Sequence, residues 1–217
     1  ARILHIDTSR AERVPGVLAV LTAANTPEVR FGFLRDNLAL KRGVVRQFRD
    51  EVAAVAAVDA DAAAEAVQLI HVDYEPLPAV FDPEEALRED APLVHDVDPS
   101  GKPRTTNRLA LKFHHESGDL AASRRASRHV VEGRFSTQLV QQCCLGTAGC
   151  IAEFDLQGHL TLWTKTQIPF LAQRDFVAAL AAMGLGDRNV RVIVPHLGGS
   201  FGTGLDTHAY EYIAILL

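Results

Sequence analysis

The chain has 217 residues, enough for one large domain or two small ones with a real hydrophobic core. It carries 22 Lys and Arg against 27 Asp and Glu, with no basic stripe interleaved with aromatic residues, which argues against a nucleic-acid-binding surface. No apolar run approaches membrane-spanning length, so no membrane contact is expected.

The cysteines and the two ends of the chain indicate where the protein is located and whether the sequence is part of a longer polypeptide. Cys143, Cys144 and Cys150 are an odd, clustered set, which predicts structural thiols rather than a disulfide framework. The first residues show no signal peptide, so a cytoplasmic protein is expected. The chain lacks an initiator Met and a helix runs into Leu217, so we expect a piece of a longer polypeptide.

The first 80 residues have a mixed α/β pattern. Strands are expected at residues 2–7, 17–22, 52–58 and 71–74. Residues 23–43 are polar and broken, which predicts loop. Asp59 or Asp61 can cap a helix that runs to about Ile70. The short links around this helix predict a β-α-β unit with a right-handed crossover.

The middle of the chain, from Asp82 to Ser127, is rich in Pro, Asp, His, Ser and Arg. One short helix is expected at residues 83–89, and the rest is predicted to be surface linker. His115-Glu116 resembles the start of a zinc motif, but Asp119 stands where the second His is needed. A solvated loop is therefore predicted there.

From His129 the pattern is regular again. Strands are expected at residues 130–135, 150–154, 160–164 and 190–194, the second and third joined as a hairpin. Pro169 opens a helix that stops at Gly184. Gln167 is thereby placed between the end of a strand and the start of a helix, where side chains often serve sites.

A glycine-rich turn follows the last of these strands. Pro195 ends the strand, and four glycines, from Gly198 to Gly204, fall within seven residues before another helix. Asp206 or Thr207 can cap that helix. The free N–H groups of such a turn form an anion-binding site.

Three known motifs compete for this turn. Gly199 and Gly204 have P-loop spacing, but Leu205 and Asp206 replace the Lys and Ser/Thr that a P-loop needs. A dinucleotide-binding fingerprint fails because Thr207 stands at its third glycine. The segment Gly198-x-Ser200-x-Gly202 matches the nucleophile elbow of a serine hydrolase, and this alternative stays open.

Several stretches together resemble the xanthine dehydrogenase/aldehyde oxidase family. Those similar to its a/b hammerhead domain are Val52–Val58, Ala63–Val67, Val72–Val80 and Asp82–Leu87. Those similar to the start of its molybdopterin-binding domain are His129–Phe135, Leu160–Gln167 and Val190–Gly202. The resemblance implies an α+β (mixed α/β) fold with a hammerhead domain at residues 1–82, an extended linker at 83–128 and a truncated molybdopterin-binding domain at 129–217.

The resemblance also implies an activity and partners. The family consists of molybdenum hydroxylases, which oxidise an aldehyde or an N-heterocyclic or aromatic small molecule with oxygen derived from water. Their cofactor is molybdenum-molybdopterin, here expected in the cytosine dinucleotide form. Electrons pass to [2Fe-2S] and FAD centres, implied here on an iron-sulfur subunit and an FAD subunit, within an oligomer.

The resemblance assigns roles to particular residues. Gln167 matches the glutamine that hydrogen-bonds the apical oxygen ligand of molybdenum, and no residue here ligates the metal directly. Residues Gly198, Gly199, Ser200, Phe201 and Gly202 match the loop beside the metal and the pterin phosphate. Phe201, Leu145 and Leu205 are expected to line the substrate pocket.

The chain departs from the family pattern in three ways. Thr203-Gly204-Leu205 replaces a frequent Gly-Lys-Glu, and Cys144–Thr147 replaces a frequent Met-Glu-Pro, so purine-like substrates are not expected. The family's catalytic glutamate lies near the C-terminus of the full subunit, so no catalytic residue is expected in this chain. The chain alone is expected to be inactive, and a non-catalytic assembly module is the remaining alternative.

Overall fold

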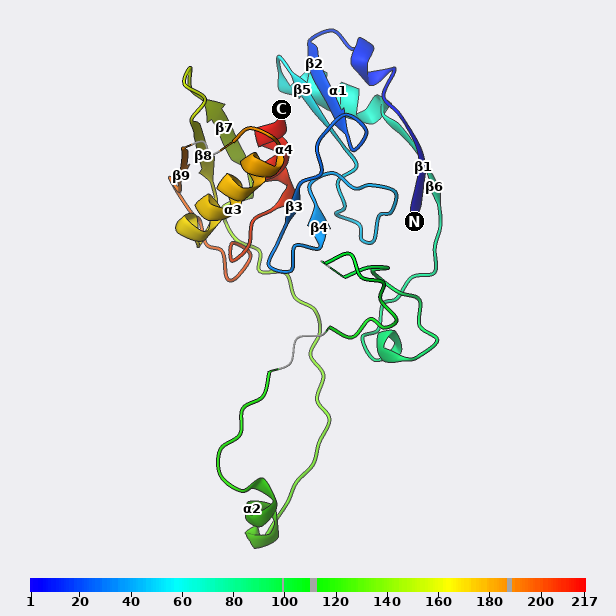
Figure 1. Cartoon of the computed structure of the whole chain (residues 1–217), viewed down its shortest axis with the longest axis vertical. Coiled ribbons are helices and arrows are strands. Elements are labelled where there is room, and N and C mark those ends of the chain that lie inside the picture. Colours follow the sequence, from blue (N-terminus) through cyan, green and yellow to red (C-terminus); the bar gives the residue numbers. More distant parts are fainter. Residues whose placement is uncertain (99, 110–112, 187–188) are drawn as a thin grey trace.

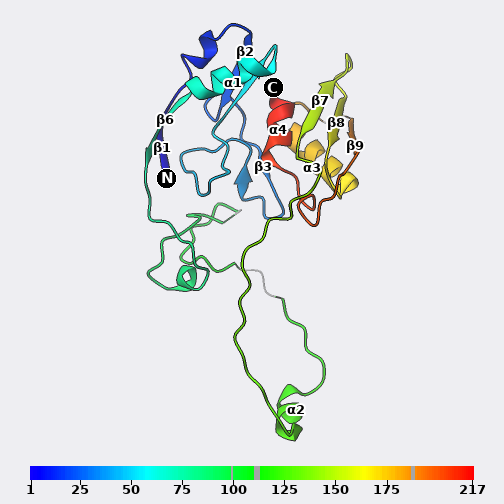
Figure 2. The ribbon, with the colours of Figure 1, turned by 180° about the vertical axis from the view of Figure 1, so that it is seen from behind.

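The computed structural model describes residues 1–217 apart from 99, 110–112 and 187–188. Two lobes lie side by side, and a long excursion projects away from both of them (Figures 1 and 2). The predicted mixture of helix and strand is confirmed. Within the described residues, no helix is both long and apolar enough to cross a bilayer.

The first lobe contains two separate two-stranded sheets and a helix. Its elements are β1 (Arg2–Asp7), β2 (Val17–Thr22), β5 (Ala53–Ala57), α1 (Ala60–Leu69) and β6 (His71–Glu75). Strand β1 pairs antiparallel with β6, and β2 pairs antiparallel with β5. The Asp59 carboxylate caps α1 by accepting from the backbone N–H of Ala62 at 2.8 Å.

The predicted right-handed β-α-β crossover is wrong. Strands β5 and β6, which flank α1, belong to different sheets, and each pairs antiparallel with an earlier strand. A crossover joins two parallel strands of one sheet, and no such pair forms here. The local sequence pattern predicts where strands and helices lie. Which strand pairs with which depends on contacts between residues far apart in the sequence.

The second lobe is a three-stranded sheet covered by helices. Its elements are β7 (Cys150–Phe154), β8 (Leu160–Thr164), α3 (Pro169–Ala182), β9 (Val190–Ile193) and α4 (Ala209–Leu216). The predicted hairpin of β7 and β8 is present, and β9 pairs with β8 in parallel. Helix α3 begins at Pro169, as expected for a residue that needs no N–H partner at a first turn.

Residues 23–43, predicted as loop, in fact join the two lobes. They contain two short strands, β3 (Arg30–Phe31) and β4 (Asn37–Leu38), and supply four residues of the main hydrophobic core. The ring of Phe31 stacks on that of Tyr212 in α4 with centroids 5.1 Å apart, and Phe176 of α3 meets Tyr212 edge-on at 5.2 Å. The charged residues around Phe31 interrupt its apolar pattern, so the sequence concealed this packing.

The middle of the chain departs from the predicted linker and strand. Residues 83–89 contain only a single 3-10 turn at Glu85–Leu87, and α2 (Leu120–Ala126) forms further along. The strand predicted at 130–135 is extended but pairs with no other strand among the described residues.

The N-cap of α4 (Ala209–Leu216) lies one residue after Thr207 and two after Asp206, the two predicted caps. His208 is its N-cap residue, and its backbone N–H donates to Glu211 Oε2 at 2.8 Å. The other carboxylate oxygen of Glu211 accepts from the Thr164 hydroxyl. Burial raises the pKa of Glu211 above its ordinary value of 4.5, and these two hydrogen bonds offset part of that rise.

We expect Glu211 to make the protein less stable as pH rises. The folded state holds the Glu211 proton more tightly than the unfolded chain. The contribution of Glu211 to the free energy of unfolding is therefore fully present below pH 4.5 and is lost as pH rises through the pKa of the folded state. Glu211→Gln should flatten this slope in chemical denaturation between pH 4 and 8, whereas Glu65→Gln on the exposed side of α1 should keep it. An unchanged slope in Glu211→Gln would contradict the assignment.

Candidate functional site

The connection between β8 and α3 holds two loops together. Thr166 is buried, and its hydroxyl donates to the carbonyl oxygen of Gly204 at 3.3 Å. The backbone N–H of Gln167 donates to the same oxygen at 2.9 Å. The ammonium group of Lys165 donates to the carbonyl oxygen of Gly146. Three consecutive residues therefore fix the glycine-rich loop and the turn around residue 146.

The side chain of Gln167 faces the glycine-rich loop. Its Oε1 accepts from the backbone N–H of Gly202 at 3.2 Å. That bond occupies the carboxamide oxygen, and Nε2 has no hydrogen-bond acceptor among the described residues. The amide donor of Gln167 is thus available to a ligand.

The loop from Gly198 to Gly202 has an unusual backbone. Gly198, Gly199 and Gly202 all have positive φ, and so does Phe201 at 48°, a conformation that costs a residue with a Cβ energy. Within the described part of the chain, the N–H groups of residues 198–201 have no hydrogen-bond partner. Four consecutive unpaired donors beside a free amide can bind an anionic group.

A close backbone contact seats this loop. The N–H of Gly146 donates to the carbonyl oxygen of Gly198 at 3.0 Å. A Cβ on Gly198 would lie 2.6 Å from both Cα and N of Gly146, closer than any side chain can approach backbone. Gly146 was missed by sequence reasoning, because its partner is 52 positions away and no local motif marks the contact.

A second tie missed from the sequence joins the loop to the first lobe. Asp206, predicted only as a possible helix cap, accepts from the backbone N–H of Phe33 through Oδ2 at 3.2 Å. Its other oxygen accepts from the N–H of Thr207 at 2.8 Å. The far end of the glycine-rich loop is therefore attached to the segment that joins the two lobes.

The residues predicted to line the substrate pocket lie around the loop. Phe201, Leu205 and Leu145 all have exposed side chains. Leu145 immediately precedes Gly146, so its backbone lies beside Gly198, and the N–H of Leu205 donates to the Gly202 carbonyl at 3.2 Å. Three apolar side chains are therefore exposed on the loop and on the turn that contacts it.

Ser200 does not present a nucleophile. Its side chain is 3% exposed, and its Oγ accepts from the N–H of Gly204 at 2.7 Å and lies 3.1 Å from the Thr203 hydroxyl. The imidazole of His208 donates from Nε2 to the Thr203 carbonyl at 2.8 Å. Ser200 and His208 therefore both hold the loop by hydrogen bonds, and the serine hydrolase alternative has no structural support.

The cysteines are less buried than predicted. Cys143 is exposed and Cys144 half-buried, with Sγ of Cys144 at 4.0 Å from the Thr203 hydroxyl. Cys150 is half-buried, and burial raises its pKa to about 11, so this thiol is unreactive at neutral pH. Among the described residues, no group of three or more His, Cys, Asp or Glu is arranged to hold a metal ion.

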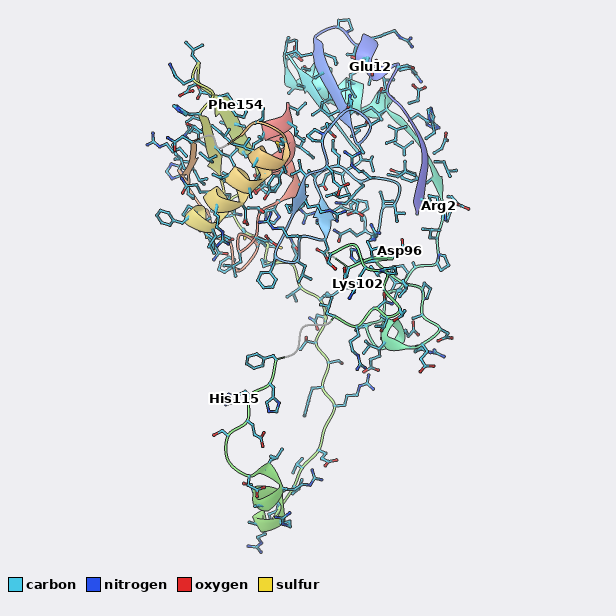
Figure 3. The ribbon with its side chains drawn as sticks, in the orientation of Figure 1. Arg2, Glu12, Asp96, Lys102, His115 and Phe154 are labelled. Carbon is cyan, nitrogen blue, oxygen red and sulfur yellow. The ribbon has the colours of Figure 1, made fainter. Side chains whose placement is uncertain are left out.

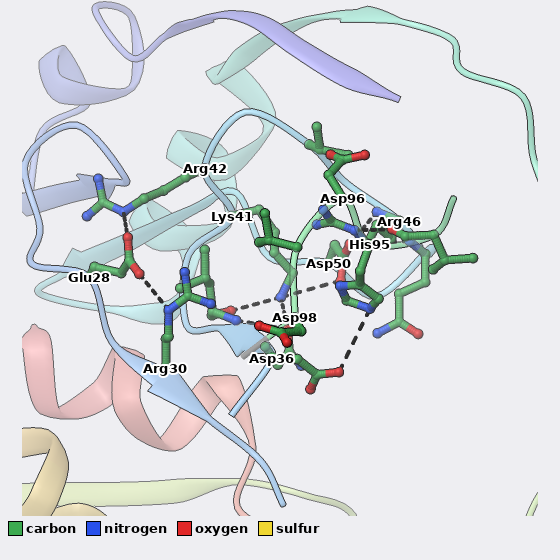
Figure 4. A pocket seen from close by; sticks show the side chains of 16 residues that line it. Glu28, Arg30, Asp36, Lys41, Arg42, Arg46, Asp50, His95, Asp96 and Asp98 are labelled. Atoms are coloured by element: carbon green, nitrogen blue, oxygen red, sulfur yellow. Dashed lines mark hydrogen bonds and ion pairs between the residues drawn. The ribbon is translucent and has the colours of Figure 1, made fainter. Parts of the chain in front are cut away.

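A pocket of about 450 Å³ lies apart from the loop, between residues 28–50 and 94–98 (Figure 4). Its charges largely satisfy one another. Glu28 pairs with Arg30 at 2.7 Å, and the buried Lys41 pairs with Asp50 at 3.4 Å. These ion pairs stabilise the first lobe. The unpaired hydrogen-bond donors described above lie instead in the glycine-rich loop.

Comparison with known proteins agrees with the geometry. Residues 1–78 match the family model of the aldehyde oxidase and xanthine dehydrogenase a/b hammerhead domain, and residues 101–217 match that of the molybdopterin cofactor-binding domain. The carbon monoxide dehydrogenase large chain of Afipia carboxidovorans is 33% identical over all of this chain and 28% of its own length. The nicotinate dehydrogenase large molybdopterin subunit of Eubacterium barkeri is 34% identical over all of this chain and 48% of its own.

The structural comparison reaches the same group of proteins. Reconstituted CO dehydrogenase from Oligotropha carboxidovorans superposes with a TM-score of 0.79 at 32% identity, covering all of this chain and 28% of that one. The chain thus spans between a quarter and a half of the length of these relatives. It belongs to the aldehyde oxidase and xanthine dehydrogenase family, and carries the family's a/b hammerhead and molybdopterin cofactor-binding regions.

Proposed function

We propose that this chain is part of the molybdenum subunit of a hydroxylase that oxidises an aldehyde or an N-heterocyclic or aromatic small molecule with oxygen from water. One observation carries the proposal: the N–H groups of residues 198–201 are unpaired within the described chain, and the next residue, Gly202, is hydrogen-bonded to the side chain of Gln167, whose amide donor is free. Hydrogen-bond donors placed in this way suit an anionic cofactor that also bears an oxygen acceptor.

The residues present fit a molybdenum-molybdopterin cofactor, proposed in its cytosine dinucleotide form. When bound, the cofactor supplies the two-electron oxidation of the substrate carbon. In the proposal, the backbone of Gly198, Gly199, Ser200, Phe201 and Gly202 binds its anionic part. The amide of Gln167 donates to it, and the tie to Gly202 holds that amide in place.

The substrate is proposed to meet the apolar side chains of Phe201, Leu205 and Leu145. These side chains are exposed around the loop, and they carry no charge that would select an acidic or basic substrate. A relative at 34% identity is named for nicotinate, an N-heterocycle. The absence of a carboxylate at residues 145 and 205 disfavours purine-like molecules.

The domain division, the partners and the compartment complete the proposal. We place a hammerhead domain at 1–82, a linker at 83–128 and part of the molybdopterin domain at 129–217. The two family matches cover residues 1–78 and 101–217, so the second includes part of the proposed linker. The relatives are named large chains or subunits, which supports separate [2Fe-2S] and FAD subunits in an oligomer. The unpaired cysteines suit the cytoplasm.

Metal analysis tests the proposal against a non-catalytic module. The longer subunit, purified together with its neighbouring subunits, should contain about one molybdenum per chain, measured by plasma mass spectrometry. It should also release a fluorescent pterin on acid oxidation. A complex that is folded and assembled but contains neither would instead identify an assembly module that has lost the cofactor.

A further inference from the structure

A long arm projects from the body of the molecule. It comprises the described residues 113–145, with α2 near its tip (Figures 1 and 2). His115, on the outgoing side, lies far from both lobes (Figure 3). From 113 to 143 every residue is exposed except Ala122, which is half-buried. Packing against the described body therefore does not account for the arm's shape.

The returning half of the arm, residues 128–142, is an extended strand without a partner. We call it the return strand. None of its backbone N–H or C=O groups makes a hydrogen bond within the described chain. Such a row of unpaired groups is the usual template for adding another strand.

The return strand also exposes several large apolar side chains. Val131 and Phe135 lie four residues apart, and thus on one face of an extended chain, with exposures of 93% and 94%. Leu139 and Val140 are exposed as well. Burying large apolar side chains away from water is favourable, so the strand gains from a covering partner.

One exposed ion pair ties the return strand to residue 84, and another lies within the arm. Arg134 pairs with Glu84 at 2.6 Å, and Arg124 of α2 pairs with Glu132 at 2.6 Å. At its end the arm joins the Gly146–Gly198 contact beside the candidate site. These pairs neutralise two charges of the return strand, Glu132 and Arg134, whereas Arg128 has no ion pair within the described chain. The surface of the strand therefore combines apolar side chains with polar ones.

We propose that the return strand is a docking edge, and that its occupant is a β-strand from the part of the molybdenum subunit outside these 217 residues. The molybdopterin-domain match spans 101–217 and so includes the arm. In relatives matched over the whole of this chain, between half and three-quarters of the subunit lies elsewhere. That remaining polypeptide is the nearest source of an apolar strand.

The proposal rests on the assignment to a larger molybdenum subunit, but its test does not depend on the cofactor. Hydrogen exchange measured by mass spectrometry compares this 217-residue chain with the longer subunit. We expect amides of residues 128–142 to exchange at rates near those of free chain in the first, and roughly a hundredfold or more slower in the second. Fast exchange in both proteins would overturn the proposal.

A second copy of this chain is the competing occupant. Protection of the return strand in the 217-residue chain, increasing with protein concentration, would show a second copy and overturn the proposal. Measuring molybdenum in the same longer subunit tests the proposed function separately from the docking edge. Protection of the return strand without bound molybdenum would support the docking edge and contradict only the proposed function.

Paired variants give an independent test in the longer subunit. Leu139 on the return strand and Leu156 in the β7–β8 turn are both fully exposed leucines in the described structure. Leu139→Ser should raise exchange in residues 128–142 at least severalfold, whereas Leu156→Ser should leave it unchanged. Equal behaviour of the two variants would contradict the docking edge.

Discussion

Replacing Gly198 by alanine should sharply reduce cofactor retention in the molybdenum subunit. The new Cβ would lie 2.6 Å from two backbone atoms of Gly146, and alanine would have to adopt a φ of 64°. Strain of this kind costs about 1–3 kcal/mol, which corresponds to roughly 5- to 150-fold weaker binding. Molybdenum content per chain, measured after dialysis, should fall accordingly.

A matched glycine controls for general damage. Gly149 lies near the same turn, but a Cβ there would meet nothing within 4 Å and its φ is not positive. Gly149→Ala should therefore retain molybdenum. Thermal unfolding of both variants separates a local change of the loop from loss of the fold. Full molybdenum loading in Gly198→Ala would show that the Gly146–Gly198 contact does not shape the cofactor site.

Replacing Gln167 by glutamate should lower turnover by about a hundredfold to a thousandfold, the usual effect of removing one donor aimed at a reacting centre. The substitution keeps an oxygen that can accept from Gly202 N–H, so the loop tie at 3.2 Å can persist. It removes the amide donor and adds a negative charge where an anionic cofactor is proposed. The measurement is kcat of the assembled enzyme, corrected for its molybdenum content.

Two further variants separate chemistry from structure. Gln167→Ala loses both the donor and the tie to Gly202, so it should lower turnover and also loosen the loop. Gln68→Glu, on the exposed side of α1, makes the same chemical change away from the site and should leave kcat unchanged. If Gln167→Glu and Gln68→Glu turned over equally, Gln167 would have no role at the reacting centre.

Local chemistry explains which elements could be predicted. The β7–β8 hairpin has alternating apolar residues on either side of Asp155–Gly158, and α3 starts at a proline that suits a first helical turn. Asp59 could be recognised as a cap because a carboxylate there accepts from an N–H three residues later. Each of these signals involves neighbours within a few positions along the chain.

The predictions that failed depend on residues far apart in the sequence. Residues 130–135 have strand composition, but a strand forms only where a partner supplies hydrogen bonds, and none is present in the described chain. The β-α-β prediction failed because β5 and β6 each chose an earlier strand. Residues 29–40 were read as loop, although Phe31 packs against Tyr212 across 181 positions of sequence.

The sequence by itself determined helices α1, α3 and α4, most strands, the family, and the two short segments, around Gln167 and around Gly198–Gly202, on which the proposed function depends. Those features follow from local backbone preferences and from residues adjacent along the chain. Only the tertiary structure decided that Gln167 faces Gly202, that Gly146 packs against Gly198, and that Ser200 is buried. These are contacts between distant residues, and burial and hydrogen bonding select them only once the whole chain has packed.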